Sequence, residues 1–318
     1  MLVWLLTLAC SGDEDTGAMA EDTGPGEPTA ETGRTDTGSP IVDPPPPPTA
    51  AEVIEDRAEL SALVEALTTA GLRDALAEPN DALTVLAPTD AAFTALGAVS
   101  PVPGVLANVL LFHVVPEEIA AADLASRPTL PTLSRLSLTT AASPTTIEGA
   151  ELGATVDLSA RNGLVHTLGQ VLVPPTTVEL LTQTPTLTTL KAALDASVLT
   201  SSIDPATLDG ATPLTVFAPT NAALAAAGIE LNNPPANLVE ILQLHVVSGQ
   251  HLVGDLSDGD VLTTVDGAQL EVAYDPVGGV TSLVDPRGRT TAISDQLDLR
   301  TLSGVVHVLD GVLLPSGN

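Results

Sequence analysis

Cations are scarce in this sequence. Its 318 residues include 10 Lys and Arg against 40 Asp and Glu, which gives a formal net charge of −30 at pH 7. A nucleic-acid interface needs clustered cations to displace the counterions of the phosphates, and electrostatic docking on anionic lipids needs them as well. The composition therefore excludes a nucleic-acid partner, and it excludes membrane contact through surface charge.

Aromatic residues are also rare, at 2% of the sequence. Trp4 lies at the extreme N-terminus, and the others are Phe93, Phe112, Phe217 and Tyr274. These four are too few for a base-stacking surface or a sugar-stacking cleft. Hydrophobic residues nevertheless reach 44%, which is too many for a disordered acidic chain. The sequence therefore predicts aliphatic, acidic, globular structure, and its length suggests two domains.

Cys10 is the only cysteine, so no intrachain disulfide can form. The nine residues before it, MLVWLLTLA, are apolar but too short to span a bilayer, for which a helix needs about 20 residues. Residues 1–9 fit the hydrophobic region of a signal peptide, with the small Ala9 at the cleavage point. A thiol packed in a core is the alternative, but the polar, acidic residues that follow offer no such core.

A cysteine at this point resembles the lipoprotein box of bacteria. The resemblance implies that Cys10 is lipidated and becomes the mature N-terminus. Ser11, which follows it, favours the outer membrane or cell surface over retention at the inner membrane. We therefore expect an exported protein that is anchored to the cell envelope and contacts the membrane only through this lipid.

Residues 10–50 have the composition of a tether. Ser11 to Ala50 contains nine acidic residues, one arginine and the five consecutive prolines Pro44 to Pro48. Such a segment cannot bury enough apolar surface to offset its ordering entropy, and a proline run is extended at about 3.1 Å per residue. The segment is thus either a disordered leader without further role or, if Cys10 is lipidated, a stalk that holds the folded part off a membrane.

The rest of the chain contains an internal repeat. TVLAPTDAAF (84–93) recurs as TVFAPTNAAL (215–224), and LLFHVV, ending at residue 115, recurs as LQLHVV, ending at residue 247. NGLVHTLGQVLVP, starting at residue 162, recurs as SGVVHVLDGVLLP, starting at residue 303, so the offsets are 131, 132 and 141 residues. Offsets of this size suit two whole domains rather than a solenoid repeat. We therefore predict one domain over residues 51–175 and a second over residues 176–318.

Helical spacing dominates the first half of each copy. Leucine and valine at i, i+3, i+4 and i+7 predict a helix within residues 60–67, and similar spacing recurs within residues 187–194. A further helix with the same spacing, ending at a histidine, is expected within residues 106–113 and again within residues 238–245. Each copy therefore begins with amphipathic helices.

Strands are expected between and after these helices. Short apolar runs at 83–86 and 214–217 are followed by Ala-Pro and then by Thr89 or Thr220, which are placed to N-cap the next helix. The last part of each copy is rich in Val, Leu and Thr, and in the second copy two Asp-Gly steps, at 258–259 and 266–267, have the composition of hairpin turns. Helices followed by strands predict an α+β fold.

The repeated blocks resemble the fasciclin domain. The strand and Ala-Pro-Thr of residues 84–93 and 215–224 match its first motif, Phe112-His113 and Leu244-His245 match the aromatic-His end of its central helix, and the blocks starting at residues 162 and 303 match its last motif. The resemblance covers residues 51–315. It implies a β-sandwich packed against several short helices in each copy, in an extracellular protein used for adhesion or matrix contact.

The resemblance also points to candidate partner-binding residues. In animal members, an Asp-Ile pair before the last motif and the Tyr-His region contact receptors, and the matching positions here are Asp157, Leu158, Asp298, Leu299, Phe112, His113, Leu244 and His245. Phe112 and Leu244 stand where the family has tyrosine, so no hydroxyl is available there. The alternative is structural: the aspartates cap turns and the leucines fill the core.

No catalytic or metal-binding pattern is evident in the sequence. Four histidines repeat between the copies, but none has a second histidine at i+3 or i+4, so hydrogen-bonded structural histidines are favoured over metal ligands. Asp255, Asp258 and Asp260 lack the spacing of an EF-hand and fit a solvated turn better. No nucleophile motif, Walker loop or dinucleotide fingerprint occurs. We therefore expect no enzyme activity, no catalytic residue, no metal site and no cofactor.

Two functions fit these features. The first is a non-enzymatic adhesion protein, tethered through lipidated Cys10, that contacts a protein or glycan on another cell, the matrix or the envelope. The second is an extracytoplasmic module that binds a small ligand or has a structural role in the envelope. Two tethered copies favour the first, because they raise avidity through effective concentration even when each copy binds weakly.

Overall fold

The computed structural model describes residues 45–78, 82–97, 103–142, 144–198, 213–275 and 280–316. The predicted signal peptide (residues 1–9), Cys10 and the predicted tether up to residue 44 lie outside the described residues. The compact unit runs from Pro46 to Asn318 and contains both repeats. None of the described helices is long and apolar enough to cross a membrane.

The compact unit includes residues that precede Ala51. Helix α1 (Ala50–Glu55) begins with a capping box, in which the Thr49 side chain accepts from the N–H of Glu52 and the Glu52 carboxylate accepts from the N–H of Thr49. The N–H of Ala50, a buried residue, donates to Oδ1 of Asn162 over 2.8 Å. These contacts fix the chain to repeat 1 from Thr49 onward.

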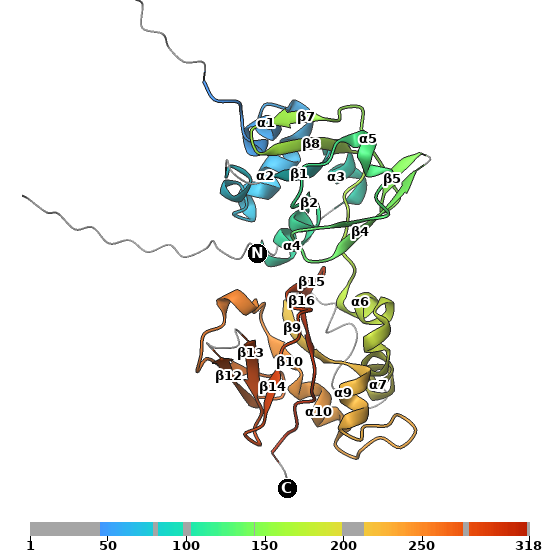
Figure 1. Ribbon diagram of the computed structural model, residues 1–318, viewed down its shortest axis with the longest axis vertical. Coiled ribbons are helices and arrows are strands. Elements are labelled where there is room, and N and C mark those ends of the chain that lie inside the picture. Colours follow the sequence, from blue (N-terminus) through green and yellow to red (C-terminus); the bar gives the residue numbers. More distant parts are fainter. Residues whose placement is uncertain are drawn as a thin grey trace, which may run out of the picture. The chain divides into compact units, whose positions relative to one another are not determined.

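Repeat 1 combines short helices with two four-stranded sheets (Figure 1). Its helical elements are α1, η1 (Ala58–Leu60), α2 (Ser61–Thr69), η2 (Asp74–Leu76), α3 (Asp90–Leu96), α4 (Pro103–Phe112) and α5 (Ala121–Leu124). One sheet has the order β2-β1-β8-β7, from β1 (Leu83–Pro88), β2 (Val114–Val115), β7 (Leu158–Ala160) and β8 (Gly163–Leu168). The other is the meander β3 (Thr129–Pro131), β4 (Ser137–Ala142), β5 (Thr145–Ile147) and β6 (Ala150–Glu151).

Repeat 2 has the same plan. Its helical elements are α6 (Thr177–Gln183), η3 (Pro185–Leu187), α7 (Thr188–Val198), α9 (Asn221–Ala226), α10 (Leu238–Leu244) and η4 (Val253–Asp255). The first sheet has the order β10-β9-β16-β15, from β9 (Leu214–Pro219), β10 (Val246–Ser248), β15 (Leu299–Arg300) and β16 (Gly304–Leu309). The second is the meander β11 (Val261–Thr263), β12 (Gln269–Asp275), β13 (Val280–Val284) and β14 (Thr290–Ala292).

The predicted α+β class is confirmed. Helix α2 and strands β1 and β9 form where the sequence predicts them, and Thr89 and Thr220 cap α3 and α9 by accepting from the N–H groups of Ala92 and Ala223. Among the described strands, each repeat has one parallel pair, β1 with β8 or β9 with β16, and the other pairs are antiparallel. One of the two Asp-Gly predictions is wrong: the step at 266–267 joins β11 to β12, but the step at 258–259 is a turn ahead of β11.

Two glycines bring the parallel strands together. A Cβ on Gly163 would lie 1.8 Å from the carbonyl oxygen of Leu83, and one on Gly304 would lie 2.0 Å from that of Leu214. Both glycines pair directly with these residues in the strand register. Only glycine fits, so the Asn-Gly and Ser-Gly steps of the third repeated block are explained by backbone contact.

The two sheets of each repeat share an apolar core. In repeat 2, one cluster of buried side chains takes residues from both sheets, including Phe217, Leu270, Leu283 and Leu309. In repeat 1, buried leucines of β1, β3, β4 and β8 belong to a single cluster, and this cluster continues into the helices of repeat 2 through Leu180. The apolar core is therefore continuous across the junction of the repeats.

Candidate functional site

The buried His113 lies one residue beyond α4, within the Phe112-His113 pair. Its Nδ1 is 2.8 Å from the carbonyl oxygen of Val109, and the N–H of Leu172 donates to its Nε2 over 2.9 Å. Because Nε2 accepts a hydrogen bond, the proton resides on Nδ1, which donates to the carbonyl. The ring is neutral, and it connects the end of α4 to the segment after β8.

His245 makes the equivalent bonds in repeat 2. Its Nδ1 is 2.7 Å from the carbonyl oxygen of Ile241, and the N–H of Leu313 donates to its Nε2 over 3.1 Å. Burial lowers the pKa of His113 to about 4, and burial lowers that of His245 to about 4 as well, against a usual value of about 6.5. Both rings are therefore structural hydrogen-bonding groups at neutral pH.

His166 holds the turn that contains Asp157. The N–H of Asp157 donates to Nδ1 of His166 over 3.0 Å, and Nε2 of His166 is 2.8 Å from the carbonyl oxygen of Ile119. Asp157 has a φ of 56°, and its Oδ1 accepts from the N–H of Ala121 at the start of α5. Its carboxylate remains 46% exposed, so a partner has access to it.

His307 repeats this arrangement with a different degree of exposure. The N–H of Asp298 donates to Nδ1 of His307 over 3.1 Å, and Nε2 is 2.8 Å from the carbonyl oxygen of His251. Burial lowers the pKa of His307. Asp298 has a φ of 55° and accepts from the N–H of Val253, and its side chain is only 11% exposed. The two aspartates therefore share a turn geometry, but Asp157 is far more accessible.

The apolar candidates lie mostly within the cores. Phe112 and Leu244 are 3% and 0% exposed, while Leu158 and Leu299 are partly buried and pack against core clusters. These contacts agree with the structural alternative, in which the aspartate holds a turn and the leucine fills the core. Direct partner contact by the predicted residues stays a prediction, and Asp157 is the one among them whose polar side chain is nearly half exposed.

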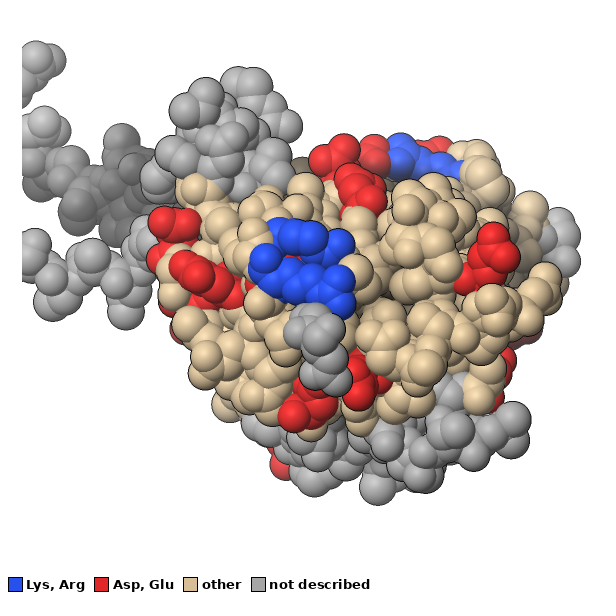
Figure 2. Space-filling view, turned by 90° about the horizontal axis from the view of Figure 1, so that it is seen from below, with Lys and Arg blue, Asp and Glu red and all other residues tan. Residues whose placement is uncertain are grey.

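Acidic groups are distributed rather than clustered. Within the described ranges, no group of three or more His, Cys, Asp or Glu side chains could hold a metal ion. The carboxylates of Asp258 and Asp260 accept from the N–H groups of Tyr274 and Ser257, and these bonds stabilise the turn around them. On the face in Figure 2, the acidic side chains lie in separate groups, whereas Lys and Arg gather in two places.

Asp285 is a fully buried carboxylate in the β13–β14 turn. Its Oδ2 lies 2.6 Å from Nη2 of Arg289 and accepts from the N–H of Leu314, while its Oδ1 accepts from the N–H groups of Arg287 and Arg289. Burial alone would raise the pKa of Asp285, but the bonds from Arg289 and from the backbone outweigh burial and lower it. The turn that carries Arg287 and Arg289 is thus organised around a structural ion pair and fixes the C-terminal segment.

Asn108 joins the two repeats, a role that the sequence did not reveal. It is buried on α4, and its Nδ2 lies 2.8 Å and 3.2 Å from the carbonyl oxygens of Thr301 and Gly304 in repeat 2. Its Oδ1 accepts from the Gln250 side chain, so both the nitrogen and the oxygen of the amide are hydrogen-bonded. The available signal was a single amide inside the apolar helix LANVLLF, because a buried polar group needs partners.

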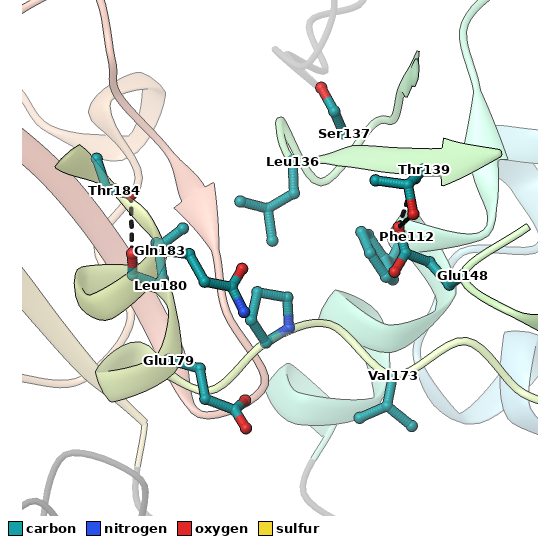
Figure 3. Close-up of a pocket in the computed structure, with 11 residues that line it drawn as sticks. Phe112, Leu136, Ser137, Thr139, Glu148, Val173, Glu179, Leu180, Gln183 and Thr184 are labelled. Carbon is teal, nitrogen blue, oxygen red and sulfur yellow. Dashed lines mark hydrogen bonds between the residues drawn. The ribbon is translucent and has the colours of Figure 1, made fainter. Parts of the chain in front are cut away.

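A groove of about 450 Å³ lies at the same junction. Repeat 1 contributes residues of α4, β4 and the β5–β6 turn, and repeat 2 contributes residues of α6 (Figure 3). The lining combines apolar and polar side chains: Phe112, Leu136, Ser137, Thr139, Glu148, Val173, Pro175, Glu179, Leu180, Gln183 and Thr184. Among the predicted site residues only Phe112 borders this groove.

Known proteins share the repeated pattern. The family model described as "Fasciclin domain" matches residues 58–174 and 185–315. Transforming growth factor-beta-induced protein ig-h3 of Sus scrofa is 35% identical over 268 residues, which cover 82% of this chain and 37% of that protein. A fasciclin-like arabinogalactan protein of Arthroderma benhamiae is 28% identical over 165 residues, which cover 51% of this chain and 35% of that protein. The chain therefore spans little more than a third of the length of these relatives.

A solved structure of similar architecture is the FAS1 domain pair of the insect cell adhesion molecule fasciclin I. It has a TM-score of 0.45 and 18% sequence identity, and the match covers 83% of this chain and 95% of the domain pair. The resemblance inferred from the three repeated motifs is confirmed by the family matches over both repeats. This chain belongs to the fasciclin-domain family and carries two fasciclin domains in tandem.

Proposed function

We propose that this protein is a non-enzymatic adhesion protein of the bacterial cell surface. It contacts a protein or glycan on another cell, the matrix or the envelope. The observation that carries this proposal is the tandem pair of fasciclin domains, an arrangement that also occurs in the cell adhesion molecule fasciclin I. Two domains on one chain increase the strength of weak contacts because the second binding step is intramolecular.

The chemistry of the described residues supports a contact function rather than a catalytic one. In each of the four repeated histidines, both ring nitrogens are hydrogen-bonded to backbone groups. A general base must instead be free to reach a substrate proton. Asp157 is the most accessible of the candidate contact residues, and we expect it to contribute more than the largely buried Asp298.

The proposal places the protein on the outer side of the envelope through Cys10. The apolar residues before Cys10 act as a signal peptide, the cysteine carries the lipid, and the acidic, proline-containing segment up to Pro45 separates the lipid from the compact unit. Mass spectrometry of the N-terminal peptide tests this part directly. A diacylglyceryl-modified Cys10 is expected, and an unmodified thiol in a chain that retains Met1 would contradict it.

Adhesion itself is tested with protein-coated beads. Beads carrying residues 46–318, which keep the α1 capping box, are expected to adhere to the producing cells, and beads coated with denatured protein are the control. Beads with a single repeat are expected to adhere less, and measurements with and without Ca²⁺ show whether the cation bridges the acidic surface. Adhesion no greater than that of the denatured coat would refute a self-adhesion role.

A small-ligand module is the second candidate, and the junction groove is the observation in its favour. Its volume of about 450 Å³ lies within the range of ligand sites, at roughly 300 to 1,000 Å³. A thermal-shift screen with membrane lipids and small apolar molecules tests this function. A ligand at a hundredfold excess over its Kd would stabilise the protein by about 2.7 kcal/mol, and such a result without bead adhesion would favour this candidate.

A further inference from the structure

We propose that the junction groove binds a lysine or arginine side chain of a partner protein. This inference rests on the proposed adhesion function and assigns it a binding site. The site differs from the turns that carry Asp157 and Asp298, because it forms only where the two domains meet. Four features of the groove support a cationic side chain as its occupant: its charge, its apolar walls, its polar groups and its origin in both repeats.

The charge of the groove is negative. Its lining includes two carboxylates, Glu148 and Glu179, and no Lys, Arg or His. Neither carboxylate forms an ion pair with a described cation, whereas Glu55, Glu117 and Asp195 do. A cation entering the groove therefore meets unpaired charge of the opposite sign, and an anion is repelled.

The walls next to these carboxylates are apolar. Leu136 and Leu180 are each 8% exposed, and Val173 remains 43% exposed. In Figure 3, the Leu136 side chain extends toward the space between α6 and β4, and Val173 lies below it. Lysine and arginine match such a surface, because their aliphatic stems pack on apolar atoms while the charged group reaches polar partners.

The polar groups are already oriented. Oε1 of Glu148 accepts from the N–H and hydroxyl of Thr139, and Oε2 of Glu179 accepts from the N–H of Thr176 in the α6 capping box. Each carboxylate is thus fixed by the backbone of its own domain, and its second oxygen accepts no hydrogen bond from the described residues. Fixed acceptors lose less conformational freedom on binding a cation than mobile ones.

The groove also explains why two domains are needed. Glu148 and Leu136 come from repeat 1, and Glu179 and Leu180 come from repeat 2. Asn108 and the continuous apolar core hold the two domains together at this point. A single repeat retains only half of the groove, so it loses the site even when it remains folded.

The test uses a protein spanning Ser11 to Asn318 and two labelled hexapeptides, acetyl-Gly-Ser-Leu-Arg-Ser-Gly-amide and the same peptide with Glu in place of Arg. Chemical-shift mapping by NMR is expected to show that only the arginine peptide perturbs residues of α6 and of the β5–β6 turn. Binding should weaken as salt increases, because these carboxylates are exposed. Equal perturbation by both peptides, or perturbation elsewhere only, would overturn the proposal.

Substitutions supply the second measurement. The pair Glu148→Gln and Glu179→Gln removes both charges and keeps the acceptor oxygens that stabilise β4 and the capping box, so the fold is preserved. We expect the double variant to bind the arginine peptide roughly fivefold more weakly, since it loses two exposed charges and each exposed ion pair contributes little by itself. Glu240→Gln, on the exposed side of α10, is the matched control and should leave binding unchanged.

The same variants separate this inference from the proposed function. If bead adhesion persists at the wild-type level in the Glu148→Gln/Glu179→Gln variant, adhesion uses another surface and the inference is wrong. If the arginine peptide binds at the groove but the beads do not adhere, the groove is a cation-binding site and the adhesion function is wrong. If peptide binding and bead adhesion both weaken in the double variant and neither weakens in the Glu240→Gln control, both the inference and the adhesion function are supported.

Discussion

Acid should destabilise this protein through two of its buried histidines, His113 and His245. His113 and His245 have a pKa of about 4 in the folded protein, because burial disfavours the charged ring. The same rings have a pKa of about 6.5 when the chain is unfolded. Between these values the unfolded chain binds the protons, so the stabilisation is complete above pH 6.5 and is lost as the pH falls through 4.

The size of the effect follows from the two pKa values. At pH 5, each histidine lowers the free energy of unfolding by about 2 kcal/mol relative to neutral pH, and the full loss below pH 3 is about 3–4 kcal/mol for each. His113→Gln or His245→Gln removes the titrating group and retains one of its hydrogen bonds. Each variant should be less stable than wild type at pH 7.5, but its stability should fall by about 2 kcal/mol less on going to pH 5.

Urea denaturation at pH 7.5 and pH 5, followed by circular dichroism, measures this difference. Thr89→Ala is the control, because it removes a helix cap and should lower the free energy of unfolding equally at both pH values. A His113→Gln variant with the same pH dependence as wild type would refute the reasoning. If neither variant folds, NMR of the wild-type imidazoles decides: rings that become protonated near pH 6.5 in the folded protein would contradict their burial as neutral groups.

Three further substitutions test the fold and the junction. Thr89→Ala should cost about 1 kcal/mol of unfolding free energy in urea denaturation, because α3 loses its N-cap bond, and no change would show that the cap is not needed. Gly163→Ala should lower the free energy of unfolding by at least about 3 kcal/mol, because its Cβ would lie 1.8 Å from the β1 backbone. Gly254→Ala is the control, because a Cβ there has no atom within 4 Å. Equal effects of the two substitutions would contradict the close strand approach. Asn108→Ala should lower the free energy of unfolding by about 1–3 kcal/mol, because the buried Thr301 carbonyl loses its bond from this amide, while the equivalent Glu240→Ala should change calorimetric stability little. A neutral Asn108→Ala would show that the junction does not depend on this amide.

Local features of the fold could be predicted from the sequence because short-range physics determines them. The apolar spacing within residues 60–67 predicts α2, and a threonine after Ala-Pro predicts the caps of α3 and α9. The internal repeat strengthens these predictions, because the same pattern occurs in both copies. The Asp-Gly step at 258–259 misled the prediction because an Asp-Gly pair favours a left-handed glycine in any tight turn, whether or not two strands flank it.

Long-range features could not be predicted. The parallel pairing of β1 with β8 joins residues that lie 80 positions apart, such as Leu83 and Gly163, and no local pattern encodes that partner. Each of the four histidines also has one hydrogen-bond partner in a distant loop, which could not be predicted for the same reason. Most of the junction groove was also missed. Its two glutamates have no distinguishing pattern in the sequence, and they come to line one groove only when the domains meet.

The most direct test of the account is the force needed to detach one cell from another. Single-cell force spectroscopy would compare producing cells, cells that lack the protein, and cells that carry the Glu148→Gln/Glu179→Gln variant at equal surface density. The account predicts a lower detachment force without the protein and an intermediate force with the variant. Equal detachment forces with and without the protein, on every surface tested, would contradict an adhesive function.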